Sequence, residues 1–150
     1  MENMKTETKT TNKKYEILAE FVKDMSSETP DIETFIFVKG NIKNYHLNID
    51  LNSKPIKNKI IEVNTILKFE DKNLENKKSH FEITYTAVVK IDDDVDEKKE
   101  LEKIILCDVP KTIYPNLEKI FLTLLISSGL PEVKIEKKVD FEKLFNERLN

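Results

Sequence analysis

The side chains that could do chemistry in this chain are few and scattered. Both histidines, His46 and His80, fall in stretches where polar and apolar residues alternate. A shared strand face would let His80 and Glu82 hold an ion as a pair, but a zinc site needs three or four protein ligands. The spacing therefore predicts no metal site.

Nucleophilic and phosphate-binding motifs are also missing from the sequence. Cys107 is the single cysteine and has no histidine near it in sequence, whereas a catalytic thiol needs an activating base. A lone thiol of this kind is typical of a small buried hydrophobic side chain in a reducing compartment. Residues 92–97, DDDVDE, lack the glycine and terminal glutamate of an EF-hand loop. With only Gly40 and Gly129, no phosphate-cradling loop is available. We predict a protein that is not an enzyme and needs no cofactor.

Composition narrows the class further. The 150 residues suit one domain, and 35% of them are charged with a net charge of −3, so nothing favours a nucleic-acid partner. Residues 1–14 have no apolar core, and the longest apolar run, IFLTLLISS, is too short to span a bilayer. We expect a soluble cytoplasmic protein without membrane insertion. Residues 1–13 are expected to be a disordered tail, and residues 14–150 a single domain.

The elements that must position any functional surface begin with strands. The apolar residues of 15–25 fit both the alternation of a strand and the spacing of a helix. We favour a strand because Pro30 and a Ser/Thr cluster follow. Residues 30–44 look like a loop despite their apolar content. Three runs then alternate cleanly, over residues 45–53, 60–71 and 79–92. Short polar links between them predict an antiparallel meander with one buried face.

Helices occupy the second half. Residues 100–107 have helical spacing, and we expect Pro110 to end that helix. Residues 114–130 form the strongest helical pattern, with Pro115 in the first turn and Gly129 at the stop. This helix is apolar on more than one face, which favours a subunit interface. Residues 140–150 predict a short helix capped by Asp140. The fold class is therefore α+β: a four-stranded antiparallel sheet with a long helix and a short C-terminal helix packed on one face.

Two segments, taken together, resemble the SecB family of protein-export chaperones. KDMSSETP, residues 23–30, is similar to the family signature at the end of the first strand. The run from Cys107 to Phe145 is similar to the family's proline-rich entry to the long helix, the Gly-x-x-Pro break and the Phe-x-x-Leu-Phe terminal helix. The resemblance covers about residues 15–149, and the order of the motifs along one chain makes it specific.

The resemblance implies a function and an assembly. It implies an ATP-independent holdase that keeps unfolded precursor proteins translocation-competent and delivers them to SecA. It also implies a homotetramer, built as a dimer of dimers through sheet edges and long helices. In the family, acids of the signature and one glutamate of the last strand bind a basic, zinc-containing tail of SecA. The matching residues are Asp24, Glu28 and Glu82. Without the resemblance, these acids would be read as an ordinary solvated face.

Family position also assigns two apolar sets. The client groove would be floored by the second strand and walled by the terminal helix and an apolar loop. Its residues would be Phe35, Phe37, Leu47, Ile49, Leu51, Phe141, Leu144 and Phe145. The subunit interface would include Phe81, Ile83, Tyr85, Leu122 and Ile126. For each groove residue, a place in the ordinary core is the alternative.

The sequence departs from the family pattern at three positions. Phe37 stands where a tryptophan is common, His80 where an aliphatic residue flanks the SecA-contacting glutamate, and Phe81 where a small cysteine is common. Two other functions stay open. One is a SecB-like chaperone dedicated to one client, such as an antitoxin, for which the SecA-binding acids would not be needed. The other is a small ligand-binding α+β domain or enzyme, which would need a pocket with converging polar groups.

Overall fold

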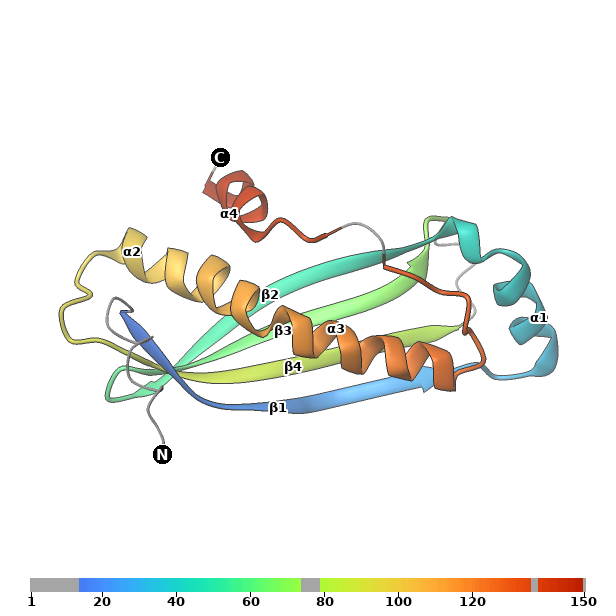
Figure 1. Ribbon diagram of the computed structural model, residues 1–150, viewed down its shortest axis with the longest axis horizontal. Coiled ribbons are helices and arrows are strands. Elements are labelled where there is room, and N and C mark those ends of the chain that lie inside the picture. The colour runs from blue at the N-terminus through green and yellow to red at the C-terminus, as the bar shows by residue number, and fades with distance from the viewer. Residues whose placement is uncertain (1–13, 74–78, 136–137, 150) are drawn as a thin grey trace, which may run out of the picture.

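The computed structural model describes residues 14–73, 79–135 and 138–149. The predicted tail, residues 1–13, lies outside the described residues. A four-stranded antiparallel sheet has the strand order β1-β4-β3-β2, so β1 (Tyr15–Glu28) and β2 (Tyr45–Lys57) are its edges. The inner strands are β3 (Ile60–Asp71) and β4 (His80–Ile91). The predicted α+β class is confirmed, and Figure 1 shows the long helix lying across one face of the sheet.

The alternation of buried and more exposed residues along β3 and β4 explains why these strands form a sheet with one covered face. Residues Ile61, Val63, Thr65, Leu67 and Phe69 of β3 are buried, as are Phe81, Ile83, Tyr85, Ala87 and Val89 of β4. Side chains of alternate residues point to the same face of a strand, so both sets lie on the face that the helices cover. The link between β2 and β3 is tight because Asn58 and Lys59 both have positive φ, the conformation of a two-residue type I′ hairpin turn.

Strand β1 is predicted in its type but not in its register. Two register shifts interrupt its pairing with β4, one between Ile17 and Ala19 and one between Val22 and Asp24. Ile17 lies opposite the buried Val89, whereas Phe21 lies opposite Thr86 on the other face of the sheet. An inserted residue reverses the alternation of every side chain that follows. The simple alternation predicted through residues 15–21 is therefore wrong beyond Ile17.

Residues 30–44 are not a loop, as predicted, but contain helix α1 (Ile32–Gly40) and a short 3-10 turn, η2 (Ile42–Asn44). Asp31 caps α1, since its carboxylate accepts a hydrogen bond from the Thr34 amide at 2.8 Å. The helix has no single apolar face: Thr34 and Val38 are buried, while Ile32 and Ile36 point into solvent. This arrangement removed the periodicity that would have predicted a helix.

The long helix begins much earlier than predicted. Helix α2 (Lys98–Lys103), the π-helical turn η4 (Ile104–Asp108) and helix α3 (Val109–Ser127) follow one another without a loop. Pro110, expected to end a helix, lies in the first turn of α3, where its missing amide hydrogen costs little. The wide turn before it closes with the Val109 amide donating to the Ile104 carbonyl. Pro115 lies inside the helix rather than at its start.

Helix α3 packs on β4, β3 and β1 and forms the centre of the core. Leu117, Phe121 and Leu125 are fully buried beneath it. The predicted stop at Gly129 is present: the Gly129 amide donates to Ile126 and the Leu130 amide to Leu125, the bond pair of a Schellman motif. The chain then crosses above β2 to α4 (Phe141–Leu149), and Asp140 caps α4 by accepting from the Lys143 amide at 3.0 Å.

Replacing Gly129 with Ala should destabilise the protein. Gly129 has a φ of +91°, and an added Cβ would lie 2.6 Å from Cε1 of Phe35. The left-handed conformation costs a residue with a Cβ about 1–2 kcal/mol, and the displaced ring adds to that cost. Urea denaturation should show a lower free energy of unfolding. Gly40→Ala is the matched control, because nothing lies within 4 Å of its added Cβ. An equal loss in both variants would contradict this explanation.

Candidate functional site

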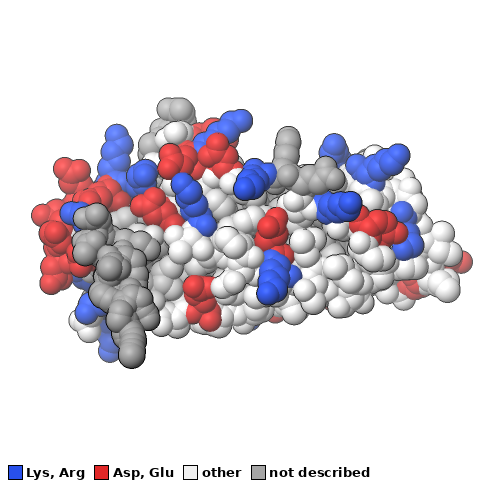
Figure 2. Space-filling view, in the orientation of Figure 1, with Lys and Arg blue, Asp and Glu red and all other residues white. Residues whose placement is uncertain are grey.

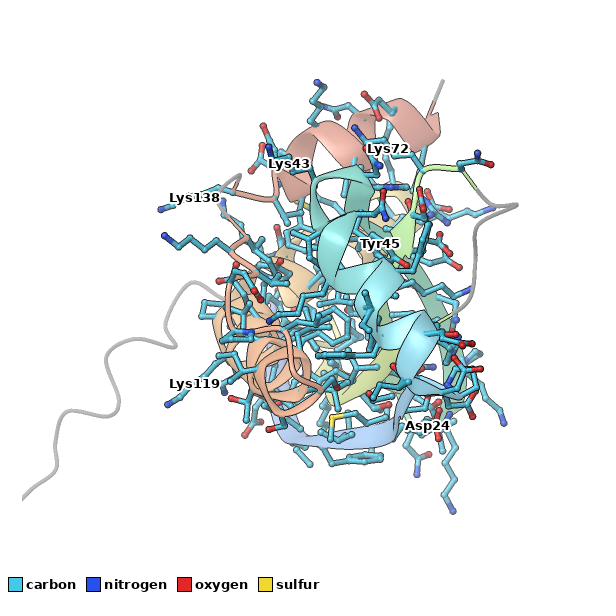
Figure 3. All side chains as sticks on the ribbon, turned by 90° about the vertical axis from the view of Figure 1, so that its right-hand side faces the viewer. Asp24, Lys43, Tyr45, Lys72, Lys119 and Lys138 are labelled. Carbon is cyan, nitrogen blue, oxygen red and sulfur yellow. The ribbon has the colours of Figure 1, made fainter. Side chains whose placement is uncertain are left out.

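The three acids singled out in the sequence lie together on the sheet face opposite the helices. In the β1–β4 register, Ser26 pairs with Glu82, Glu28 with His80 and Asp24 with Thr84. Strand alternation places Asp24, Glu28 and Glu82 on one face, and Glu82 lies two register positions from each of the other two acids. We call these three residues the acidic cluster. Figure 3 shows Asp24 on the far side of the sheet from α3.

Contacts around the acidic cluster hold the β1 end in place. The Ser27 and Ser128 hydroxyls lie 2.6 Å apart, and the Thr29 and Ser79 hydroxyls 3.2 Å apart. These bonds join the end of β1 to the end of α3 and the start of β4. His80 Nε2 lies 3.3 Å from Glu82 Oε1, so a protonated His80 would partly neutralise that carboxylate. The strand ends that carry the cluster are thus tied down, and its carboxylates lie on the sheet surface, an arrangement suited to a basic partner segment.

A second surface runs along the helix-side face of β2. Its larger part is an open groove of about 660 Å³ between β2, β3 and the segment that leads to α4. Its apolar lining comes from Tyr45, Leu47, Ile49, Phe69, Ile135 and Val139. Lys72, Lys134 and Lys138 also line it. A smaller cleft of about 210 Å³ shares Ile49 and continues to Leu51, Leu144, Glu147 and Arg148. We call the two parts together the β2 groove.

The groove contains only some of the residues predicted for it. Leu47, Ile49, Leu51 and Leu144 line it, although Leu51 is itself mostly buried. Phe141 and Phe145 are buried instead, and the Phe141 ring packs edge-on against Tyr114 at 5.5 Å. They anchor α4 to the protomer's own core and do not wall the groove. The amphipathic pattern of residues 140–150 correctly predicted a helix. The pattern alone does not say whether the apolar face packs on the protomer's own core or lines a groove.

Helix α1 also lies away from the groove lining. The Phe35 ring packs against Gly129, with Lys39 Nζ 5.8 Å from the ring centre. Phe37 is partly buried against the core. Sequence reasoning missed Tyr45 and Phe69, which are in phase with Leu47 and pack together with ring centres 5.3 Å apart. Extending the alternation of Leu47, Ile49 and Leu51 back by one step would have found Tyr45, whereas Phe69, already on the predicted buried face of its own strand, needed the β2–β3 register that pairs it with Leu47.

Of the residues predicted for the subunit interface, some are buried inside the protomer and others are exposed. Phe81, Ile83 and Tyr85 lie inside the protomer under α3, with at most 5% of any of them exposed, so no subunit surface is made of them. Leu122 is partly buried, and Ile126 on α3 is half exposed. Strand β1 instead carries the exposed apolar residues Leu18, Phe21, Val22 and Met25. The mixed periodicity of residues 15–25, which made their structure ambiguous in sequence, reflects these outward-facing positions.

The remaining reactive groups do not converge on a site. Cys107 is fully buried, and burial raises the pKa of its thiol, with a further increase from Asp108; a protonated thiol is a poor nucleophile. Within the described ranges, no group of three or more His, Cys, Asp or Glu side chains could hold a metal ion. Nor does any described helix have the length and apolar content needed to cross a membrane.

Comparisons with known proteins identify the family of the chain. Residues 8–150 match the family model described as preprotein translocase subunit SecB. The chain belongs to the SecB family. A SecB-named protein of Pelagibacter ubique is 62% identical over 136 residues, covering 91% of this chain and 97% of that protein. The protein-export protein SecB of Xanthobacter autotrophicus is 26% identical over 133 residues, covering 89% and 83%.

The fold has also been seen in a solved structure. The Mycobacterium tuberculosis SecB-like chaperone Rv1957, in complex with a ChAD peptide from the HigA1 antitoxin, superposes with a TM-score of 0.61. It is 12% identical, and the match covers 83% of this chain and 91% of that one. At this identity the likeness shows the shared SecB fold. The SecB-family protein described here is thus a chaperone of protein export and not an enzyme.

Proposed function

We propose that this SecB-family protein is an ATP-independent holdase of the cytoplasm. It binds unfolded precursor proteins, keeps them translocation-competent and delivers them to SecA. The observation that carries the SecA step is the acidic cluster. Residues from two distant parts of the sequence, Asp24 and Glu28 on β1 and Glu82 on β4, are brought together by strand pairing. Their open position would let a basic segment dock without disturbing the core.

The client step is supported by the β2 groove. Its apolar lining is continuous over the two parts, and β2 is a sheet edge. An extended chain could therefore bury apolar side chains in the groove and add backbone hydrogen bonds along the edge. Because apolar burial is non-directional, such a groove would accept many sequences. The acidic cluster lies on the opposite face, so clients and SecA would not compete for it.

We further propose a homotetramer, a dimer of dimers. An unpaired edge strand tends to associate with other chains unless something covers it. Strand β1 is such an edge and carries Leu18, Phe21, Val22 and Met25 in exposed positions. Ile126 adds an exposed apolar side chain on α3. Covering these residues with other subunits would remove both the open edge and the apolar surface from water.

Reversing one charge of the acidic cluster should separate the two binding steps. Glu82→Lys is expected to weaken binding of a synthetic peptide of the basic SecA tail about tenfold. This corresponds to the loss of about 1–2 kcal/mol for a reversed surface charge. Binding should be measured by calorimetry at low salt, where surface charges are least screened. Suppression of aggregation of an unfolded client, without ATP and at one tetramer per client, should be unchanged.

Glu16→Lys provides the matched control. Glu16 is an exposed acid of β1 that pairs with Lys90 near the opposite end of the β1–β4 register. Its substitution changes the net charge equally but leaves the acidic cluster intact. Equal loss of tail binding in both variants would overturn the docking role. A protein that holds one client but never binds the SecA tail would instead be a dedicated chaperone, the second candidate function.

A further inference from the structure

A β-bulge in β1 places the acidic cluster on one face of the sheet. Lys23 is the inserted residue, because Val22 and Asp24 pair with neighbouring residues of β4. Without this insertion, Asp24 would lie opposite Ile83, on the face that α3 covers. An inserted residue turns every later side chain of the strand to the other face of the sheet. The bulge therefore brings the two acids of β1 to the face of the third, Glu82.

Apolar packing within the protomer holds this bulge only weakly. Val22 and Met25, the helix-side residues on either side of it, are both exposed. Register is strongly specified only where one face of a strand is buried. Strand β1 is also an edge that pairs with β4 alone among the described strands, and a bulge interrupts the ladder between them. A contact from outside the ladder would therefore have a large effect on where the bulge lies.

Lys23, the inserted residue, makes such a contact on the sheet face away from α3. Its Nζ donates a hydrogen bond to Glu62 Oε2 at 2.6 Å. Glu62 belongs to β3, so the ion pair joins β1 to β3 across the intervening β4. Only 18% of the Glu62 side chain is exposed, and hydrogen bonds from Lys23 and then from Asn64 lower the pKa of its carboxyl. Glu62 is therefore ionised at neutral pH and pairs with Lys23 as a full charge.

A chain of covered polar side chains fixes the Glu62 carboxylate in turn. Asn64 Nδ2 donates to Glu62 Oε2 and to Asn52 Oδ1, both at 2.9 Å. The Thr86 hydroxyl donates to Asn64 Oδ1 at 2.6 Å. Asn64 and Thr86 are almost fully buried, so these hydrogen bonds replace those that water would make. A bonded network of this kind makes its part of the sheet rigid.

We propose that Glu62 is a positioning residue for the acidic cluster. It holds Lys23 in the bulge, and the bulge directs Asp24 to the docking face. Beyond the bulge, the contact between the Ser27 and Ser128 hydroxyls holds the end of the same strand. The acids of β1 thus lie close to two anchored points and present their charges in one arrangement. This role rests on the proposed docking of a basic SecA segment, but Glu62 acts through Lys23 and not by contact with that segment.

Neutral substitutions separate positioning from charge. Lys23→Gln removes a cation beside Asp24, so attraction of a basic segment alone predicts tighter binding. Positioning predicts the opposite: calorimetry with the synthetic peptide of the basic SecA tail should show binding weakened about threefold to fivefold, the effect of losing one partly covered ion pair. Glu62→Gln should weaken binding by a similar factor. The Lys23→Gln/Glu62→Gln variant should bind no more weakly than either single variant, because all three lose the same contact.

Two further variants serve as controls. Lys23→Arg should bind the peptide like the wild type, because the arginine side chain can also donate to Glu62. Lys111→Gln removes the same charge and breaks an ion pair with Glu142 at 3.8 Å, but Lys111 lies on α3. Figure 2 shows the face that α3 covers, over which basic and acidic side chains are scattered. Lys111→Gln should leave peptide binding unchanged, and every variant should suppress client aggregation like the wild type.

Hydrogen exchange followed by mass spectrometry would report on the bulge itself. In Lys23→Gln and in Glu62→Gln, the amides of residues 22–25 should exchange faster than in the wild type. The amides of β2 should exchange as before, because the β2–β3 ladder does not depend on the bulge. Unchanged exchange at residues 22–25 would show that the ion pair does not hold the bulge and would overturn the proposal.

The binding results can contradict the proposal in several ways. Tighter or unchanged peptide binding by Lys23→Gln would overturn the positioning role and leave SecA docking in place. Opposite effects of the two single substitutions that cancel in the double variant would show that Glu62 acts through its charge alone. Equal weakening by Lys111→Gln would reduce the effect to net charge, and equal weakening by Lys23→Arg would exclude the ion pair as its cause. A wild-type protein that does not bind the peptide would overturn the proposed SecA docking, and the positioning role with it.

Discussion

Replacing Phe121 with Ala is expected to lower the free energy of unfolding by about 3–5 kcal/mol, the usual cost of removing a buried aromatic ring. Phe121 has no exposed surface and is among the largest fully buried side chains of the described core. It lies on α3, which packs on β1, β3 and β4. A domain of this size is stable by only about 5–15 kcal/mol, so this one change should remove a large part of its stability.

Urea denaturation followed by circular dichroism would measure the loss at several protein concentrations. Several concentrations are needed because assembly adds to the apparent stability of a subunit. Ile36→Ala is the matched control: it also shortens an apolar helical residue, but 64% of Ile36 is exposed, so its effect should stay within about 0.5 kcal/mol. A loss below about 1 kcal/mol for Phe121→Ala would mean that α3 does not pack on the sheet as described.

The Val22→Lys/Met25→Lys variant is expected to break the assembly without unfolding the subunit. Val22 and Met25 lie on the helix side of β1, opposite Tyr85 and Ile83, and are 37% and 45% exposed. Covering such half-exposed side chains contributes about 1 kcal/mol each. Losing two from each of two facing subunits weakens the contact roughly thousandfold, before the cost of covering the new charges is added.

Light scattering would follow this change through the mass. The proposed tetramer has four times the chain mass of 17.6 kDa, and the variant should give a smaller species with unchanged circular dichroism. Ile32→Lys is the control, because Ile32 is an exposed apolar residue of α1, outside the proposed contact. A tetramer that survives the double substitution, or that is lost equally in the control, would show that β1 is not a subunit contact.

Local patterns predicted much of this fold because they matched local causes. Alternation identified β3 and β4 and their buried faces, since each strand packs one face and leaves the other to water. Gly129 and Asp140 were correct as helix ends because their capping bonds are made within a few residues. Asp31 is a helix-capping residue of the same kind for α1, but the exposed Ile32 and Ile36 removed the apolar spacing that would have predicted a helix there. Pro110 misled the prediction because a preceding π turn accommodates the ring.

The functional surfaces could be predicted only where strand pairing was simple. The acidic cluster followed from the family signature, and the register of β1 with β4 brings its members together. Apolar side chains were harder, because burial in the protomer and burial by a partner leave the same residue types in the sequence. Phe141 and Phe145 are buried in the core of the protomer, whereas Val22 and Met25 are exposed. The lysines that line the β2 groove, Lys72, Lys134 and Lys138, come from two segments about 60 residues apart, which no sequence pattern connects.

The sheet order also determines when each part of the molecule can form. Strands β2, β3 and β4 are neighbours in sequence and in space, so they can pair as soon as they are made. Strand β1 is made first, yet its only strand partner in the described sheet is β4, and Tyr15 pairs with Ile91. At a synthesis rate of about 5–20 residues per second, β1 waits for β4 on the order of 3–12 seconds. The strand proposed to join subunits can thus take its place in the sheet only after β4 has been made.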